Sequence, residues 1–401
     1  MSLISVEEAL ARVLDGVATL RSEEVAIGEA HGRVLAAPLA SRRTQPPFDV
    51  SSMDGYAVRG ADLAGTGARL KQVGESAAGR PFNGKIKPGE TVRIFTGAVM
   101  PDGADTVVPQ EDAKAERDAV TLPAAKAGAY VRKRGLDFAE GKTMLEAGRR
   151  LTARDVGLAA AMDYARVSVA RRPRVAIIAT GDELVPPGAG TSPDRIVASN
   201  PISLAALLGR ENAIISDAGI VPDKLDATAA AIRRAREAAD VLITLGGASV
   251  GDHDLIAPAL NAENIALAFH RVALRPGRPL LLAVAGNLRV LGLPGNPVSS
   301  YVCALLFVVP LLRKLQGRSD VHPKAEVATL GVDLPANDHR QDYLRARVER
   351  QSDGRLVATP HDRQDSSMQA VLVGSDGLLV RAANAPAAKA GSLCQVLLFD
   401  D

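Results

Sequence analysis

The stretch VLITLGGASVGDHD, residues 241–254, ends in residue types that could bind a phosphate group and a metal ion. Its first five residues are apolar and predict a buried strand. The loop that follows is rich in small residues: Gly246, Gly247, Ser249 and Gly251. Glycines at the carboxyl end of a strand let backbone N–H groups approach phosphate oxygens. Asp252 and Asp254 add carboxylates, which Mg²⁺ prefers as ligands.

Acidic residues also follow the other strands expected in this region: Asp182, Glu183 and Asp223. The carboxyl ends of parallel strands meet at one edge of a doubly wound sheet, so we expect these acids to converge with Asp254. Any single one of them could instead cap a helix. As a set they favour a cation site, with Mg²⁺ as the ion.

Two further segments continue the same region. Arg271, Arg275 and Arg278 surround a Pro–Gly turn, where they suit either surface ion pairs or a ligand with several negative charges. In LPGNPVSS, a strand breaks at Pro294, Asn296 is placed as N-cap, and Pro297 begins a long apolar helix. An exposed helix N-terminus carrying Ser299 would bind an oxyanion, although a well-capped core helix fits the same pattern.

Polar residues in the first third of the chain have weaker signals of their own. Asp54 precedes Gly55 in a segment typical of a turn, and Thr96 precedes Gly97 at the end of a short β-like run. A hydroxyl beside a glycine can also contact a phosphate. Asp137 follows a cluster of basic residues that by itself reads as a solvated loop.

Changes in composition and in hydrophobic periodicity divide the chain into four parts, which predicts a multidomain α/β plus β protein. Residues 1–45 and 141–172 form a discontinuous helical or linker domain, with a helix from residue 5 to 17 and helix-compatible spacing to about residue 40. Residues 46–140 form a small β-rich insertion. Residues 173–317 alternate strands and helices, which predicts a three-layer α/β domain with a mostly parallel sheet. Residues 318–401 form a C-terminal β domain.

Composition excludes some classes of protein. The 401 residues carry a formal net charge of +2, which shows no electrostatic footprint for nucleic acid. The N-terminus lacks the basic and apolar regions of a secretory signal, and the apolar segment at residues 304–312 is too short to cross a bilayer. Cys303 and Cys394 lack metal-ligand spacing. We therefore expect a soluble, cytoplasmic protein without a membrane partner.

Eight sequence motifs are specific enough to indicate a protein family. The segments SSMDGYAV, IFTGAVMPDGADTVVPQE, RKRGLDFAEGKTMLEAG, ATGDEL, ASNP, GGASVGDHD, LRPGRPL and LPGNPVSS occur in this order. Together they resemble the molybdopterin molybdenumtransferase family, which includes the gephyrin E domain. The resemblance extends from about residue 5 to residue 320 and weakens after that.

This resemblance implies an enzyme of molybdenum cofactor biosynthesis. Such enzymes insert molybdenum from molybdate into adenylylated molybdopterin and release AMP in a Mg²⁺-dependent step. It also implies an elongated homodimer, in which the active cleft lies between the α/β domain of one subunit and the inserted domain of the other. Further partners would be other cofactor synthesis proteins and the molybdoenzymes that receive the product.

The resemblance also assigns roles to residues. The family's catalytic positions match Asp54, Thr96, Asp137, Glu183, Asp223 and Asp254. By chemistry, Glu183 and Asp254 are the preferred Mg²⁺ ligands, and Asp54 and Thr96 would come from the partner chain. The substrate-binding positions would be Asp182, Gly246, Gly247, Ser249 and Gly251, which include the loop around the terminal phosphate, and Arg275, Arg278, Pro294, Pro297 and Ser299, which border the molybdate pocket.

The sequence departs from the family in two places, and alternatives stay open. Arginines replace the usual lysines in the Pro–Gly turn segment, and the C-terminal segment lacks a glycine near Ser366 and Ser367, which leaves a C-terminal contribution to the site open. One alternative is an adenylyltransferase of the same pathway, against which the extra domains argue. A second is a scaffold protein that has lost catalysis, against which the complete set of acids argues. Tungstate could replace molybdate because the two anions are nearly isosteric.

Overall fold

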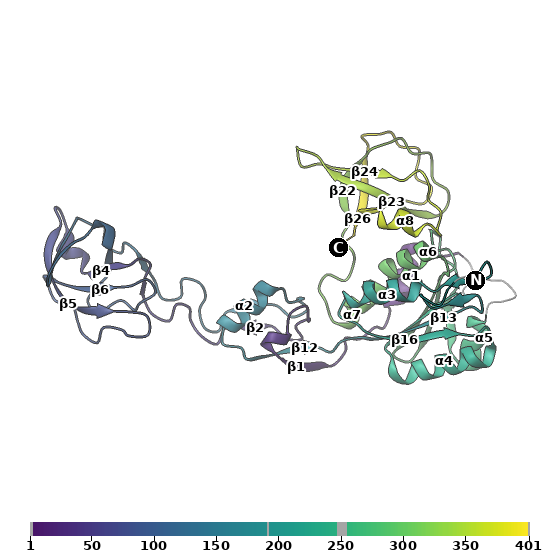
Figure 1. The fold of residues 1–401 in the computed structure, drawn as a ribbon, viewed down its shortest axis with the longest axis horizontal. Helices are drawn as coiled ribbons and strands as arrows, with labels where there is room; N and C mark the ends of the chain where they lie inside the picture. The colour runs from purple at the N-terminus through teal and green to yellow at the C-terminus, as the bar shows by residue number, and fades with distance from the viewer. Residues whose placement is uncertain (1–2, 191, 247–254, 400–401) are drawn as a thin grey trace.

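The computed structural model describes residues 3–190, 192–246 and 255–399. The molecule is elongated (Figure 1). A β unit lies at one end, a small middle unit follows, and an α/β unit lies at the other end with a C-terminal barrel beside it. The structure is therefore multidomain with mixed sheets, as the sequence indicates.

The α/β unit is built on a six-stranded sheet with the order β16-β13-β17-β21-β20-β18. The strands are β13 (Arg174–Thr180), β16 (Ile214–Val221), β17 (Val241–Leu245), β18 (Ala266–Phe269), β20 (Leu281–Ala285) and β21 (Leu288–Leu293). The first four in spatial order are parallel, and β20 runs antiparallel to both of its neighbours. Two short strands, β14 (Leu184–Val185) and β15 (Ile196–Val197), pair outside this sheet.

Helices cover both faces of this sheet (Figure 1). The helices are α1 (Val6–Leu14), α3 (Asn200–Gly209), α4 (Leu225–Ala238), α5 (Ile256–Ala262), α6 (Pro297–Cys303) and α7 (Val309–Leu315). Alternate side chains of β13 point to opposite faces: Ile177 enters a core with α1, α3, α6 and α7, and Ile178 enters a core with α4 and α5. Burial on both faces explains why the sequences of β13, β17 and β21 are continuous apolar runs.

One long helix forms the centre of the larger core. It consists of α6, the π-helical turn η4 (Ala304–Val308) and α7. Pro310 lacks the N–H that would bond to the carbonyl of Leu306, which accounts for the widened turn just before it. Among the described residues, only Pro297–Leu315 is long and apolar enough to cross a membrane, and 78% of an 18-residue stretch of it is buried inside the protein. A core helix of a globular fold has this character.

The first helix packs in the α/β unit, which corrects the expected grouping of residues 1–45. Ser5 caps α1 by accepting the N–H of Glu8, and the buried Val6, Ala9 and Val13 join the core around α7. The N–H of Ala273 also donates to the carbonyl of Ile4. The apolar stripe of this helix needs a large partner surface, and α7 provides one, with which α1 is in contact.

The middle unit contains strand pairs and one α-helix, so the prediction of a helical domain was wrong. β1 (Ser22–Ala26) pairs with β12 (Arg166–Ala170), and β2 (Leu39–Ala40) pairs with β11 (Thr143–Leu145). Short apolar runs fit helix and strand alike, and here Val25 lies opposite Val167 across a ladder. The expected helix α2 (Ala153–Ala161) is present, with the capping box of Thr152 and Asp155.

The distal β unit is inserted between β2 and β11. Its sheet has the order β7-β4-β6-β5-β9-β8. The strands are β4 (Gly55–Val58), β5 (Ala68–Ser76), β6 (Glu90–Ile94), β7 (Thr106–Pro109), β8 (Lys114–Glu116) and β9 (Ala119–Leu122), and β3 (Val50–Ser51) pairs with β10 (Val131–Arg132) beside it. Two apolar cores lie in this unit, around Tyr56 and around Ile94.

The C-terminal unit is a barrel-like sheet. Its strands are β22 (Glu326–Leu330), β23 (Gln341–Arg350), β24 (Leu356–Pro360), β25 (Gly377–Arg381) and β26 (Leu393–Leu398), with the short helix α8 (Gln369–Val373) between β24 and β25. The order β23-β24-β22-β26-β25 closes because β25 pairs back onto β23. The short strand β19 (Leu274–Arg275) of the preceding unit pairs with β23 and connects the barrel to the α/β unit.

Candidate active site

Three loops meet at the carboxyl edge of the α/β sheet. Gly246 follows β17 with a φ of +89°, and a Cβ atom there would lie 2.8 Å from the carbonyl oxygen of Thr180, at the end of β13. A Cβ atom on Gly295, after β21, would lie 3.8 Å from the Cα of Gly246. Only glycine fits Gly246 without moving backbone. The predicted convergence of strand ends is thus present in the backbone itself.

Acidic side chains stand at the same edge. The carboxylate of Asp182 accepts the backbone N–H of Asp223 at 3.1 Å, which joins the loops after β13 and β16. Both residues are exposed, as is Glu183. A Cβ atom on Gly181 would lie 2.7 Å from a carboxylate oxygen of Glu183, so the Glu183 side chain lies over this glycine. Asp182, Glu183 and Asp223 are therefore neighbours, as the sequence predicts.

Part of the predicted site lies outside the described residues. Gly247, Ser249, Gly251 and Asp254 belong to this part. Within residues 3–190, 192–246 and 255–399, no group of three or more His, Cys, Asp or Glu residues could hold a metal ion. The carboxylates of Asp182 and Glu183 have the right chemistry for Mg²⁺, and a complete ligand set would need a donor from beyond these residues.

The N-terminus of α6 is only partly exposed, because the C-terminal unit packs against it: Asn296 is exposed, whereas Ser299 is buried. Pro294 and Ser299 are buried, Pro297 is half-buried, and the N–H of Val298 donates to the carbonyl of Ser366 at 3.0 Å. The Asn296 amide donates to the Ser366 hydroxyl at 2.8 Å instead of capping the helix. Because one of the few free N–H groups at this end already has a partner, the helix offers less to an anion than the sequence suggests.

Three residues that the sequence analysis did not single out join these loops. The Asn200 amide, at the start of α3, donates to the carbonyl of Gly295 at 2.7 Å. The Gln369 amide of α8 donates to the hydroxyl of Ser199 at 2.9 Å. The C-terminal unit thus contributes Ser366 and Gln369 to the border of the site. In the sequence, both residues belong to the polar run DSSMQ. Its position at the site depends on tertiary contacts that the sequence pattern does not show.

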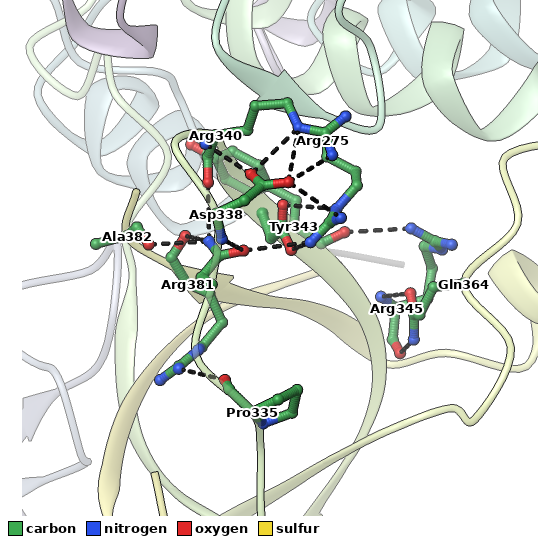
Figure 2. A network of polar contacts seen from close by, with 11 residues as sticks. Arg275, Pro335, Asp338, Arg340, Tyr343, Arg345, Gln364, Arg381 and Ala382 are labelled. Atoms are coloured by element: carbon green, nitrogen blue, oxygen red, sulfur yellow. Dashed lines mark hydrogen bonds and ion pairs between the residues drawn. The ribbon is translucent and has the colours of Figure 1, made fainter. Parts of the chain in front are cut away.

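The two arginines proposed for the substrate have different environments. Arg275 donates from Nε to the buried Asp342 at 2.8 Å, a second bond from its Nη2 reaches the same carboxylate, and Nη1 lies 3.6 Å from Asp338. Figure 2 shows Arg275 directed at Asp338 of the C-terminal unit, which Arg340 also binds. Its charge is therefore already offset by carboxylates. Arg278 is exposed and has no side-chain ion pair within the described part of the chain.

The remaining predicted residues lie in and next to the distal β unit. Asp54 precedes β4, and one of its carboxylate oxygens accepts both the N–H and the hydroxyl of Thr96, at 2.7 and 2.8 Å. The Thr96 backbone bond, then its hydroxyl bond, holds the pKa of Asp54 below its ordinary value. Asp137 is exposed at the junction with the middle unit, where its N–H donates to the carbonyl of Gln45.

One chain does not bring the two groups of acids together. β4 and β6 lie at the opposite end of the molecule from β13 and β16, with the middle unit between them (Figure 1). Asp54 and Thr96 therefore pair with each other, and Asp182, Glu183 and Asp223 form a separate group.

Comparison with protein families and known proteins identifies this arrangement. Residues 4–162 match a family model described as the MoeA N-terminal region (domain I and II), residues 176–314 match a probable molybdopterin binding domain, and residues 327–399 match the MoeA C-terminal region (domain IV). A molybdopterin molybdenumtransferase from Bacillus subtilis is 33% identical over 99% of this chain and 94% of its own length. The chain belongs to the molybdopterin molybdenumtransferase family.

Other members of the molybdopterin molybdenumtransferase family agree. A relative from a Nostoc species is 40% identical over 74% of this chain and 70% of its own length. Among solved structures, a molybdopterin biosynthesis MoeA protein from Pyrococcus horikosii superimposes with a TM-score of 0.85 and 30% identity, covering 100% of both chains. The protein is therefore an enzyme, a transferase of molybdenum cofactor biosynthesis, and the resemblance drawn from the motifs is confirmed.

Proposed function

We propose that the carboxyl edge of the α/β sheet is where this transferase inserts molybdenum from molybdate into adenylylated molybdopterin and releases AMP. The observation that carries the proposal is the close approach of Gly246 to Thr180 and Gly295, with Asp182 and Asp223 bonded to each other at the same edge. Exposed backbone at such an edge accommodates phosphate groups, and adjacent carboxylates accommodate a cation that binds them.

The chain's own residues would divide the work. The backbone of Gly246, continuing into Gly247, Ser249 and Gly251, would hold the terminal phosphate of the pterin side chain, and Asp182 would orient the substrate. Arg278 is the better candidate of the two arginines for an anion because Arg275 is bound to Asp342. Molybdate would lie near Pro294, Pro297 and Ser299, where Asn200 and Ser366 fix the loop between β21 and α6.

The donor chemistry suits Mg²⁺, and Glu183 with Asp254 would hold it. A bound magnesium ion would offset the negative charge of the pyrophosphate bridge and of the departing AMP. Glu183 is exposed at the strand edge, so it can reach a ligand without breaking a buried ion pair. Asp223 would remain the second acid of the site, with its N–H fixing the orientation of Asp182.

The active site would be shared between two copies of the chain. Asp54 and Thr96 form a preorganised pair that faces none of the other proposed residues within the same chain. A homodimer in which the distal β unit of one subunit meets the α/β unit of the other would complete the site. Asp137, at the junction of the distal and middle units, would contribute from the same subunit as Asp54.

The test is AMP release from adenylylated molybdopterin by the purified protein, with Mg²⁺ and molybdate each added or withheld. Release should require both additions. Glu183→Gln should reduce the rate roughly 100-fold or more, because a metal site supplies several kcal/mol of charge stabilisation. Glu237→Gln, an exposed acid at the end of α4, is the matched control and should keep the wild-type rate.

The alternatives give different results in the same assay. Tight binding of the adenylylated substrate without AMP release would contradict the proposal and favour a scaffold or carrier. Release without molybdate would indicate a hydrolase instead of a metal-inserting enzyme. Tungstate added in place of molybdate measures the selectivity between the two anions directly.

A further inference from the structure

A cavity of about 490 Å³ lies at the amino edge of the α/β sheet, away from the site described above. Its walls include the start of β13 at Arg174, the start of β16 at Ile214 and the start of β21 through Arg289. Parallel strands point their carboxyl ends toward the other edge, so this cavity and the candidate active site occupy opposite ends of the same strands. None of the residues assigned to catalysis above lines it.

The lining is strongly basic. It contains five arginines and two acids, which leaves an excess of positive charge. Asp240 is engaged with Arg171, whose two terminal nitrogens lie 2.7 and 2.8 Å from its carboxylate oxygens. The other acid, Glu23, forms an ion pair with Arg33. The two carboxylates therefore leave the positive charges of the remaining arginines of the cavity largely uncompensated. These arginines are Arg21, Arg172, Arg174 and Arg289, of which Arg174 lies 3.9 Å from Asp240.

Arg289 is the most unusual member of this group. Only 6% of its surface is exposed, and its Nε has no hydrogen-bond partner in the part of the chain that the structure describes. Its terminal nitrogens donate to two carbonyls, those of Gly286 at 3.2 Å and Asp15 at 2.8 Å, and no carboxylate within the described residues pairs with it. Burial lowers the pKa of Arg289, and the nearby charge of Asp15 offsets this effect only in part. An anion in the cavity would supply the missing charge.

A second arginine is held in place in a similar way. Arg172 donates from Nε to the carbonyl of Asn212 at 2.9 Å and from Nη2 to that of Ala213 at 3.3 Å. Carbonyl acceptors orient a guanidinium group without neutralising it. Arg21 is exposed at the rim, with no side-chain partner among the described residues. Two oriented arginines and one free arginine suit a tetrahedral oxyanion, which accepts several charge-assisted hydrogen bonds.

The place of the cavity in the fold suggests what binding would do. Residues 16–21 connect α1 to β1, and residues 171–173 connect β12 to β13. These are the two connections between the α/β unit and the middle unit, and both contribute to the wall. A ligand bound to Arg21 on one connection and Arg172 on the other would bridge them. It would thereby restrict the orientation of the middle and distal units.

We propose that this cavity is a binding site for a small phosphate-bearing anion that links the two connections between the middle and α/β units. Inorganic phosphate and a nucleoside monophosphate share the chemistry that the arginines recognise. The volume admits the larger ligand, and the apolar Val17 and Leu20 in the wall would favour it through contacts to its base. The inference does not depend on the reaction proposed above.

The experiment is calorimetric titration of the full-length protein with inorganic phosphate, and separately with AMP, at constant ionic strength. Saturable binding should weaken at least tenfold in Arg289→Met and in Arg21→Gln. Arg234→Gln, an exposed arginine of α4 outside the cavity, should bind as the wild type does. If Arg289→Met does not fold, Arg21→Gln decides alone, because Arg21 is exposed.

Hydrogen exchange supplies a second readout that a purely structural arginine would not change. Amide exchange at residues 16–21 and 171–172 should slow when phosphate or AMP is added to the wild type and stay unchanged in Arg21→Gln. For the binding that Arg21→Gln weakens, a higher affinity for AMP than for phosphate would assign the ligand to the nucleotide class, and equal affinities would assign recognition to the phosphate alone. Absence of saturable binding, or binding unaffected by both variants, would overturn the proposal.

Discussion

At the scale of single residues, the charged groups of this protein are mostly bound to partners that fix their position. Arg275 illustrates the consequence, because its sequence position suggests an anion ligand and its contacts are to Asp342 and Asp338. The side chain of Asp342 is only 4% exposed, so it needs a cationic partner. Arg275 therefore acts first as a connection between the α/β unit and the C-terminal barrel.

Arg275→Met should lower the free energy of unfolding by about 1–3 kcal/mol, because it leaves the Asp342 carboxylate buried without its partner. The double variant Arg275→Met/Asp342→Asn should be less destabilised than Arg275→Met alone. The control is Arg347→Met, at an exposed arginine on β23, the strand that carries Asp342. It should change the free energy of unfolding little. Chemical denaturation measures all four proteins. Equal destabilisation of the single and double variants would mean that the ion pair is not the cause.

At the scale of elements, the active edge depends on how closely three strand ends approach one another. Gly246 lies at a positive φ directly against Thr180, whereas Gly219 in β16 has a similar positive φ and nothing within 4 Å of an added Cβ. The two glycines therefore share the backbone preference and differ only in the close contact. Substitutions at these two glycines therefore distinguish the cost of the backbone conformation from the cost of the close contact between the loops.

Gly246→Ala should reduce both stability and AMP release, since the new methyl group would displace the loop after β17 or the end of β13. Gly219→Ala should carry only the cost of the backbone conformation, roughly 1–3 kcal/mol, with AMP release retained. The measurements are the free energy of unfolding and the rate of AMP release for each variant. Retained release in Gly246→Ala would show that the close approach is not needed by the active site.

The connection between β12 and β13 depends on Asp240, at the start of β17. Burial by itself would raise the pKa of Asp240, but hydrogen bonds from Arg171 and from the N–H of Arg174 outweigh this effect and hold the pKa below its ordinary value. A lowered folded-state pKa contributes stability above the unfolded pKa, and that stability is lost as the pH falls through the folded-state value.

Asp240→Asn should therefore cost about 1.5–3 kcal/mol of unfolding free energy at pH 7, the usual range for hydrogen bonds to charged groups. The difference from the wild type should shrink as the pH falls below about 4, where the unfolded chain begins to protonate this carboxylate, and it should disappear only below the lower pKa of the folded state. Asp118→Asn, in an exposed turn of the distal unit, serves as control. Thermal unfolding from pH 7 to pH 3 measures the trend. A difference independent of pH would rule out the ion pair as its origin.

At the scale of the whole molecule, the elongated shape separates the pair Asp54 and Thr96 from the acids of the α/β unit (Figure 1). A single copy cannot close the distance without folding back on itself. The proposed symmetric dimer would place each distal unit against the other subunit's α/β unit, which would give two equivalent sites. This arrangement predicts that defects in the two groups complement each other.

Asp54→Asn and Glu183→Gln should each abolish AMP release as homodimers. Mixed dimers of the two variants, coexpressed with different tags and purified through both, should regain one intact site of two, which is about half of wild-type activity. Dimers of two differently tagged Asp54→Asn subunits are the control and should stay inactive. Inactive mixed dimers would contradict a site shared in this way.

The central strands of the α/β unit, the family and most of the acidic residues at the carboxyl edge could be predicted from the sequence. The strands β13, β17 and β21 are buried on both faces, so their apolar runs, the loop glycines and the capping residues of α2 are local signals that survive folding. The helical prediction for residues 18–40 was wrong because short apolar runs fit both periods, and pairing of β1 with β12 decided between them.

Which polar groups are free depends on tertiary contacts. The tertiary structure placed α1 in the α/β core, bound Arg275 to Asp342, and covered the start of α6 with Ser366 from far along the chain. It also gave the buried Arg289 backbone carbonyls as acceptors and, among the residues from 3 to 399 that are described, no carboxylate in an ion pair. The type of a residue determines the chemistry of its side chain. Whether that side chain is free to bind a ligand depends on contacts between distant segments, which no local pattern specifies.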